Sequence, residues 1–129
     1  MNKPDFKSDR YFTFFDYHSS HRQLLLRSSK DDANPRNVDV IFFDVRYIQL
    51  PTAVRGMTIT VVRDGRTRYD SLSGHFDGNG SVFELKVGSD IFYIVGAFFR
   101  VYENDLDFFE TSLGLESPRG RDDEVTRSD

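Results

Sequence analysis

Residues 37–51 read NVDVIFFDVRYIQLP, and this stretch sets the fold class of the chain. It is rich in β-branched and aromatic residues, which fit the pleated, half-buried surface of a sheet. Its apolar residues alternate, but the phase of the alternation changes near Phe42–Phe43 and again near Tyr47–Ile48. Neighbouring side chains in a strand point to opposite faces, so each change of phase requires an extra residue or a bend. The pattern predicts one long strand with two β-bulges.

A second long apolar segment, residues 91–102 (IFYIVGAFFRVY), predicts another strand of the same kind. Gly96 in its middle indicates a bulge or a close approach of another backbone, because glycine brings no side chain to pack. Short turns such as Asp64-Gly65 separate the remaining strand-like segments, and short connections imply antiparallel pairing. Residues 106–113 predict a last strand or a short helix. We expect a mainly β fold, a curved antiparallel sheet that forms a compact sandwich or a partly open barrel with little helix.

The chain of 129 residues is long enough to bury a core in one domain. We expect that domain to span residues 1–113. From Gly114 onward the sequence GLESPRGRDDEVTRSD has almost no apolar residue. Such a composition cannot bury enough surface to offset the loss of chain entropy. Residues 114–129 are therefore predicted to form a disordered polar tail.

Composition argues against several classes of protein. The chain has no cysteine and a formal net charge of −4, so it lacks both thiolate chemistry and the basic footprint of a nucleic-acid binder. No apolar run approaches the roughly 20 residues that cross a bilayer. The first ten residues do not resemble an export signal. We therefore expect a cytoplasmic protein that binds neither nucleic acid nor membrane.

Three histidines form the candidate metal site. His18 and His21 are three residues apart with Asp16 upstream, and His75 would supply a third imidazole. With these ligands the chain would be a metal-dependent enzyme. The alternative is that His18 and His21 only cap the entrance of a strand by hydrogen bonding.

Paired aromatic residues and a group of arginines form the candidate interaction surface. Phenylalanine pairs occur at 14–15, 42–43, 98–99 and 108–109. In a strand each pair places one ring on either face. If only one face is covered, the outer rings form a patch that marks a partner site; if both are covered, they are core. We assign the following residues to the predicted surface: Phe43, Tyr47, Phe99, Arg66 and Arg68. For the two arginines the alternative is a solvated hairpin tip.

The first half of the chain resembles a known family. The segment Phe15-Asp16-Tyr17-His18 precedes a short leucine-rich strand, and FFDVRYIQL follows at residues 42–50. This order resembles that of small bacterial polymorphic-toxin immunity proteins. The resemblance implies a single β-rich domain that binds a toxin partner, and it brings no catalytic residue with it.

The sequence favours a non-enzymatic protein-interaction domain, either immunity-like or homodimeric, that needs no cofactor. Its acidic charge would suit a basic partner. One alternative is a small-molecule-binding β-barrel module with an aromatic-lined cavity. The other is the metal-dependent enzyme that uses His18, His21 and His75.

Overall fold

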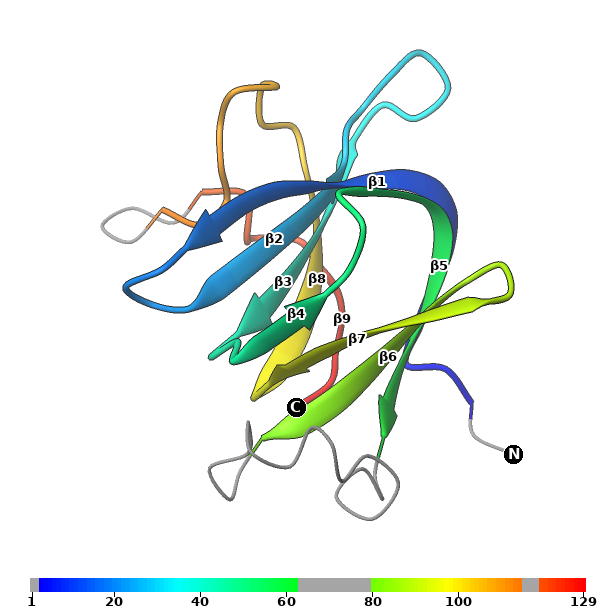
Figure 1. Cartoon of the computed structure of the whole chain (residues 1–129). Coiled ribbons are helices and arrows are strands. Elements are labelled where there is room, and N and C mark those ends of the chain that lie inside the picture. Colours follow the sequence, from blue (N-terminus) through cyan, green and yellow to red (C-terminus); the bar gives the residue numbers. More distant parts are fainter. Residues whose placement is uncertain (1–2, 63–79, 115–118) are drawn as a thin grey trace.

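The computed structural model describes residues 3–62, 80–114 and 119–129. Within these residues nine strands form one antiparallel sheet in the order β4-β7-β6-β5-β1-β2-β3-β8-β9 (Figure 1). The described residues contain no helix, so the expected all-β class is confirmed. The strands are β1 (Phe6–His18), β2 (Gln23–Ser28), β3 (Asn37–Phe43), β4 (Tyr47–Gln49), β5 (Ala53–Val62), β6 (Ser81–Val87), β7 (Asp90–Gly96), β8 (Phe98–Asn104) and β9 (Glu124–Arg127).

The two halves of the sheet pack face to face. The ring of Phe42 on β3 lies 5.4 Å from that of Phe83 on β6 and 5.6 Å from that of Phe99 on β8. Three other strands separate β3 from β6 in the sheet, so these rings meet only because the halves face each other. The three rings are fully buried in the main hydrophobic core. This packing fits the expected compact sandwich or partly open barrel, and the described strands do not close the sheet into a barrel.

A bulge bends β1 and β5, which link the two halves. Ser8 pairs with Met57 and Tyr11 with Arg55, so two residues of β1 stand opposite Gly56 of β5. Gly56 has a φ of 74°, a conformation that other residues rarely adopt. The extra residue increases the local bend. Figure 1 shows both strands curving over the same end of the molecule.

The prediction of two long, continuous strands is wrong. Residues 37–51 divide into β3 and β4 at Asp44, whose φ is 53°, and residues 91–102 divide into β7 and β8 at Ala97. The two breaks lie against each other, because the amide of Ala97 donates to the carbonyl of Phe43 at 2.9 Å. Both stretches therefore pass from one half of the sheet to the other at the same place.

The close approach expected at Gly96 is confirmed. A Cβ atom at this position would lie 3.0 Å from the carbonyl oxygen of Phe43 and 3.4 Å from that of Asp44. Both are backbone atoms, which cannot rotate away as a side chain would. Any other residue at this position would require the two backbones to move apart by a few tenths of an ångström.

The C-terminal part of the chain also differs from expectation. Residues 106–113 form neither a strand nor a helix. Beyond Gly114, the prediction of a disordered tail is wrong for residues 119–129, because β9 pairs with β8. The tail is held mainly by polar contacts, and the side chain of Arg100 donates to Asp129 at 2.8 Å. A sequence with few apolar residues gives no sign of such contacts.

We predict that Gly96→Ala lowers the free energy of unfolding by about 1–3 kcal/mol, because the new methyl group forces two backbones apart. Urea denaturation of the purified variant measures the change. Gly88→Asn is the matched control, since a Cβ at Gly88 meets nothing within 4 Å and asparagine tolerates its φ of 62°. A Gly96→Ala variant as stable as the wild type would show that this contact does not constrain the fold.

Candidate interaction site

A second hydrophobic cluster covers the outer face of β1, β2, β3 and β8. Its buried members are Leu25, Ile41, Tyr102 and Leu113, with Phe15 and Phe43 packed against them. Leu113 comes from the C-terminal segment, so the chain itself covers much of this face. The outward rings of two phenylalanine pairs are therefore covered by the chain's own residues.

An ion pair is buried in this face. Arg27 on β2 and Asp39 on β3 are register partners, and both side chains have zero solvent exposure. The Nε atom of Arg27 lies 2.7 Å from Oδ1 of Asp39, and Nη2 lies 2.9 Å from Oδ2. The ring of Phe15 covers the guanidinium at 4.1 Å. Such two-point pairing is the strongest that arginine makes with a carboxylate.

The same ion pair fixes the segment that follows β8. Oδ2 of Asp39 accepts a hydrogen bond from Ser112 of this segment at 2.7 Å and one from Asn104, the last residue of β8, at 2.9 Å. The Nη1 atom of Arg27 donates to the carbonyl of Glu110 at 2.6 Å. Buried charges stabilise a fold only when their remaining hydrogen-bonding positions are filled. The segment thus fills hydrogen-bonding positions of the ion pair, and the same hydrogen bonds fix the segment on the sheet.

We call residues 105–111 (DLDFFET) the aromatic loop. Near its start, Nδ2 of Asn37 donates to the carbonyl of Leu106 at 2.9 Å. At its end, the hydroxyl of Thr111 donates to Asp16 at 2.6 Å. Leu106 is 7% exposed. Both ends of the loop are therefore anchored on the sheet.

The tip of the aromatic loop exposes two rings to solvent. Phe108 is 64% exposed and Phe109 is 91% exposed, and the rings lie 5.1 Å apart, edge to face. The ring of Phe108 also lies 6.3 Å from that of Phe15. Among the large hydrophobic side chains of the described residues, Val125 and Tyr11 come next at 50% and 47%. Figure 1 shows the loop projecting from one end of the molecule.

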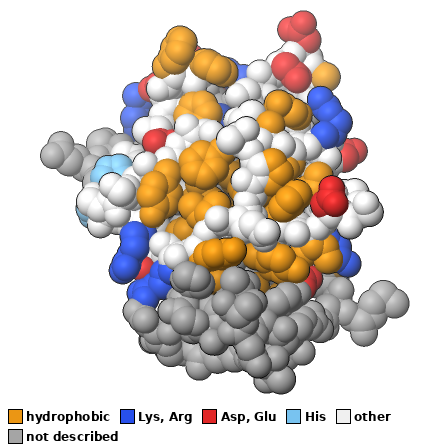
Figure 2. All heavy atoms as spheres, in the orientation of Figure 1, with side chains coloured by type: hydrophobic (Ala, Val, Ile, Leu, Met, Phe, Trp, Pro, Cys, Tyr) orange, Lys and Arg blue, Asp and Glu red, His pale blue; other side chains and the backbone are white. Residues whose placement is uncertain are grey.

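Hydrophobic side chains are also visible elsewhere on the surface. Figure 2 shows them gathered over the centre of the face seen in Figure 1, with Lys, Arg, Asp and Glu toward its edge. Visible apolar surface is ordinary in itself, because apolar atoms contribute more than half of the accessible surface of a folded protein. The aromatic loop differs because two adjacent rings are exposed on a backbone that buried contacts hold in place.

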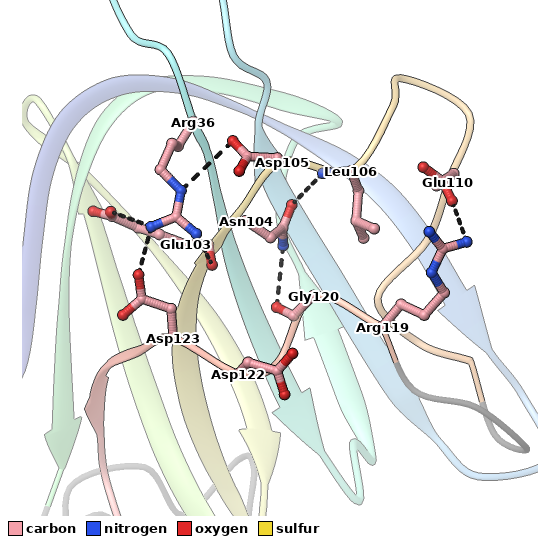
Figure 3. Close-up of a pocket in the computed structure, with 10 residues that line it drawn as sticks. All are labelled: Arg36, Glu103, Asn104, Asp105, Leu106, Glu110, Arg119, Gly120, Asp122 and Asp123. Carbon is pink, nitrogen blue, oxygen red and sulfur yellow. Dashed lines mark hydrogen bonds and ion pairs between the residues drawn. The ribbon is translucent and has the colours of Figure 1, made fainter.

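One cavity beside the aromatic loop, which we call the acidic cavity, has a volume of about 390 Å³ (Figure 3). Five carboxylates and two arginines line it. Arg36 lies between Glu103 and Asp105, each 3.6 Å away, and its hydrogen bond with Asp123 raises the pKa of Arg36. The complete lining is Arg36, Glu103, Asn104, Asp105, Leu106, Glu110, Arg119, Gly120, Asp122 and Asp123.

A second cavity, which we call the aromatic cavity, has a volume of about 640 Å³. Three aromatic rings and four cationic side chains contribute to its walls. The guanidinium of Arg55 lies 5.0 Å from the ring of Tyr11. Within the described part of the chain, Arg55 has no carboxylate partner. The complete lining is Asp9, Arg10, Tyr11, Thr13, Phe15, Arg27, Ser28, Ser29, Lys30, Asp31, Asn34, Arg55 and Phe108.

The structure does not assemble the predicted interaction surface. Phe99 is fully buried in the core, so it cannot contact a partner. Phe43 is partly buried and stacks on Phe98 at 4.6 Å. Tyr47 packs against another cluster, on the opposite half of the sheet. Arg66 and Arg68 lie outside the described residues.

The two described histidines form a small polar cluster. The rings of His18 and His21 are 5.5 Å apart, and the hydroxyl of Ser20 lies 3.0 and 3.1 Å from their Nδ1 atoms. This agrees with the hydrogen-bonding alternative. His75 lies outside the described residues, among which no group of three His, Asp or Glu side chains could hold a metal ion. The three-histidine site stays a prediction.

Comparison of the chain with family models, curated proteins and solved structures finds no match. The resemblance to immunity proteins therefore stays a prediction. Across the part of the chain that the structure describes, there is no helix of the length and apolar character needed to cross a bilayer.

Phe108 and Phe109 are not among the residues that were predicted from the sequence to form the interaction surface. Their signal is the set of carboxylates around them, Asp105, Asp107 and Glu110. The other three pairs have at least one flank of apolar or β-branched residues, whereas this pair lies between acidic residues. Charged flanks keep a segment out of a buried strand, so its rings are the ones left at the surface.

We predict that Arg27→Met lowers the free energy of unfolding by about 3–5 kcal/mol, because it leaves the charge of Asp39 buried without a counter-ion. Thermal and urea denaturation measure the loss. Arg22→Met is the matched control: Arg22 pairs with Asp44 at 2.9 Å, but both side chains are exposed, at 52% and 40%. The control should cost less than about 1 kcal/mol. Equal losses in the two variants would contradict the special role of the buried pair.

Proposed function

We propose that this chain works by binding another protein and that the aromatic loop is its contact element. The observation that carries the proposal is the exposure of Phe108 and Phe109 at 64% and 91% on an anchored loop. Exposed, contiguous apolar surface marks interaction sites, and aromatic side chains supply much of the energy of protein interfaces.

The exposure of these rings has a thermodynamic cost. Burying a phenylalanine ring contributes roughly 1.5–3 kcal/mol relative to leaving it in water. On either side of the rings, the same segment buries Leu106 and Leu113, at 7% and 1% exposure. The segment can therefore bury apolar side chains, yet it holds these two rings in solvent. A partner surface that covers them would recover the lost free energy.

The anchoring of the loop favours binding as well. Ordering a flexible loop on association reduces affinity by about 0.5–1.5 kcal/mol for each side chain that is immobilised. Here the hydrogen bonds from Arg27, Asn37 and Thr111 fix the backbone on both sides of the rings before any partner arrives. Much of the ordering is complete in the free protein.

The charges around the rings define the partner. Asp105, Asp107 and Glu110 belong to the loop, and the chain has a formal net charge of −4. The complementary surface is an apolar pocket rimmed by lysine or arginine. An anionic lipid surface would repel these carboxylates, which favours a protein partner over a membrane.

Small-molecule binding is a second candidate function. The aromatic cavity of about 640 Å³ falls within the range that is usual for ligand sites, about 300–1,000 Å³. It lies at the surface between β1, β2 and the loop. The interior, where the sequence analysis placed an aromatic-lined cavity, is instead filled by the contacts of Phe42, Phe83 and Phe99.

We predict that a photoreactive phenylalanine analogue at position 109 cross-links to one discrete protein, either a second copy of this chain or a different one. With that partner purified, Phe109→Ala should weaken binding by about 30-fold, which corresponds to an interface hot spot of about 2 kcal/mol. Cross-linking in the native host followed by binding measurements on the purified pair tests this.

Ile91 supplies the matched control, because it is a 38% exposed apolar side chain on β7. The analogue at position 91 should give no specific product, and Ile91→Ala should leave binding unchanged. If position 109 cross-links no more than position 91, the aromatic loop is not a contact element and the proposed function fails.

A further inference from the structure

We infer that the partner of the aromatic loop is a second copy of this chain, with Phe109 of each copy seated in the aromatic cavity of the other. The inference rests on the proposed function and names its partner. The required partner surface is an apolar pocket with a cationic rim. The aromatic cavity of this same chain offers three aromatic rings together with the cationic side chains of Arg10, Lys30 and Arg55, beside polar residues and the carboxylates of Asp9 and Asp31.

The cavity has the walls that a phenylalanine ring requires. Tyr11, Phe15 and Phe108 contribute aromatic surface to a volume of about 640 Å³. Tyr11 is 47% exposed, so its ring is open to a partner. Aromatic rings attract one another in edge-to-face and offset arrangements beyond the effect of buried area. Phe109, at 91% exposure, makes a described ring contact only with its neighbour Phe108.

The charges of loop and cavity are also complementary. Within the described residues neither the carboxylate of Asp107 nor the guanidinium of Arg55 has an ion pair, and the guanidinium lies 5.0 Å from the ring of Tyr11. Asp107 precedes the exposed rings, whereas Arg55 lines the cavity. When Phe109 of one copy enters the cavity of the other, Asp107 arrives beside Arg55. Each charge then gains a partner that the described residues of its own chain do not supply.

The placement of loop and cavity allows both contacts to form at once. Phe108 belongs to the loop and lines the cavity, so the two surfaces adjoin. Around a two-fold axis near Phe108, each loop faces the other copy's cavity. A two-fold interface uses one patch twice and closes, so assembly stops at the dimer.

The test is an exchange of charges between loop and cavity. Asp107→Arg alone and Arg55→Asp alone each place like charges opposite each other at both contacts of a homodimer. We predict that each variant loses self-association by about 10-fold or more. When the two variants are mixed, every contact is complementary again, because arginine at 107 meets aspartate at 55 and wild-type Arg55 meets wild-type Asp107. The mixture should dimerise although neither component does.

Light scattering and sedimentation of the full chain measure the mass over about a hundredfold range of concentration. The wild type should reach twice its 15.0 kDa mass. Asp90→Arg, an exposed charge reversal on β7, should dimerise like the wild type. Thermal denaturation of each variant checks that the fold is intact.

Two results would overturn the inference. A wild type that stays monomeric throughout excludes a second copy as the partner, and cross-linking from position 109 to a different protein would then leave the proposed function standing. A wild-type dimer that both single variants preserve, or that their mixture fails to restore, excludes the pairing of Asp107 with Arg55. If the analogue at position 109 cross-links to no protein, the proposed function itself fails. Failure of the proposed function is therefore distinguishable from failure of the inference about its partner.

Discussion

The buried pair of Arg27 and Asp39 determines where the C-terminal segment lies. Two charges without solvent exposure require every remaining donor and acceptor to be filled, and the sheet alone cannot fill them. The missing groups come from Glu110 and Ser112 in the C-terminal segment, beside Asn104 at the end of β8. The segment therefore has one place on the outer face where it satisfies the ion pair. The rings of the aromatic loop are exposed at a defined position because residues on both sides of them are committed to this network.

A second constraint acts on the other side of the sheet. The two halves face each other because two stretches of chain cross between them at one point, where Gly96 touches the backbone of Phe43. The crossing brings Phe42 and Phe99 into the same core. It also leaves Phe43 and Phe98 stacked on the outer face. In each of these two pairs, the break therefore places one phenylalanine in the inner core and its sequence neighbour on the outer face.

The sequence predicted the class of fold, but it did not predict where the long strands break or that residues 119–129 are ordered. Alternation of apolar residues shows that residues 37–51 are extended. A change in the phase of this alternation has the same sequence pattern whether the strand contains a β-bulge or ends where the chain crosses to the other half of the sheet. The tail was misread for a different reason. Its order depends on ionic contacts such as Arg100 with Asp129, in which the hydrogen bond from Arg100 lowers the pKa of Asp129. A polar sequence that makes such contacts has the same composition as one that makes none. Phe99 was predicted to lie on the surface because the alternation shows which side chains share a face of the sheet, but not which face is buried.

The supports of the aromatic loop come from distant parts of the chain. Arg27 and Glu110 are 83 residues apart, and Thr111 and Asp16 are 95 residues apart. A short synthetic peptide with the sequence DLDFFET would carry both rings but none of these supports, and it would sample many shapes in water. The recognition element is therefore discontinuous: it belongs to the folded sheet rather than to seven consecutive residues. Transplanting it to another scaffold would require carrying the outer sheet face along with the loop.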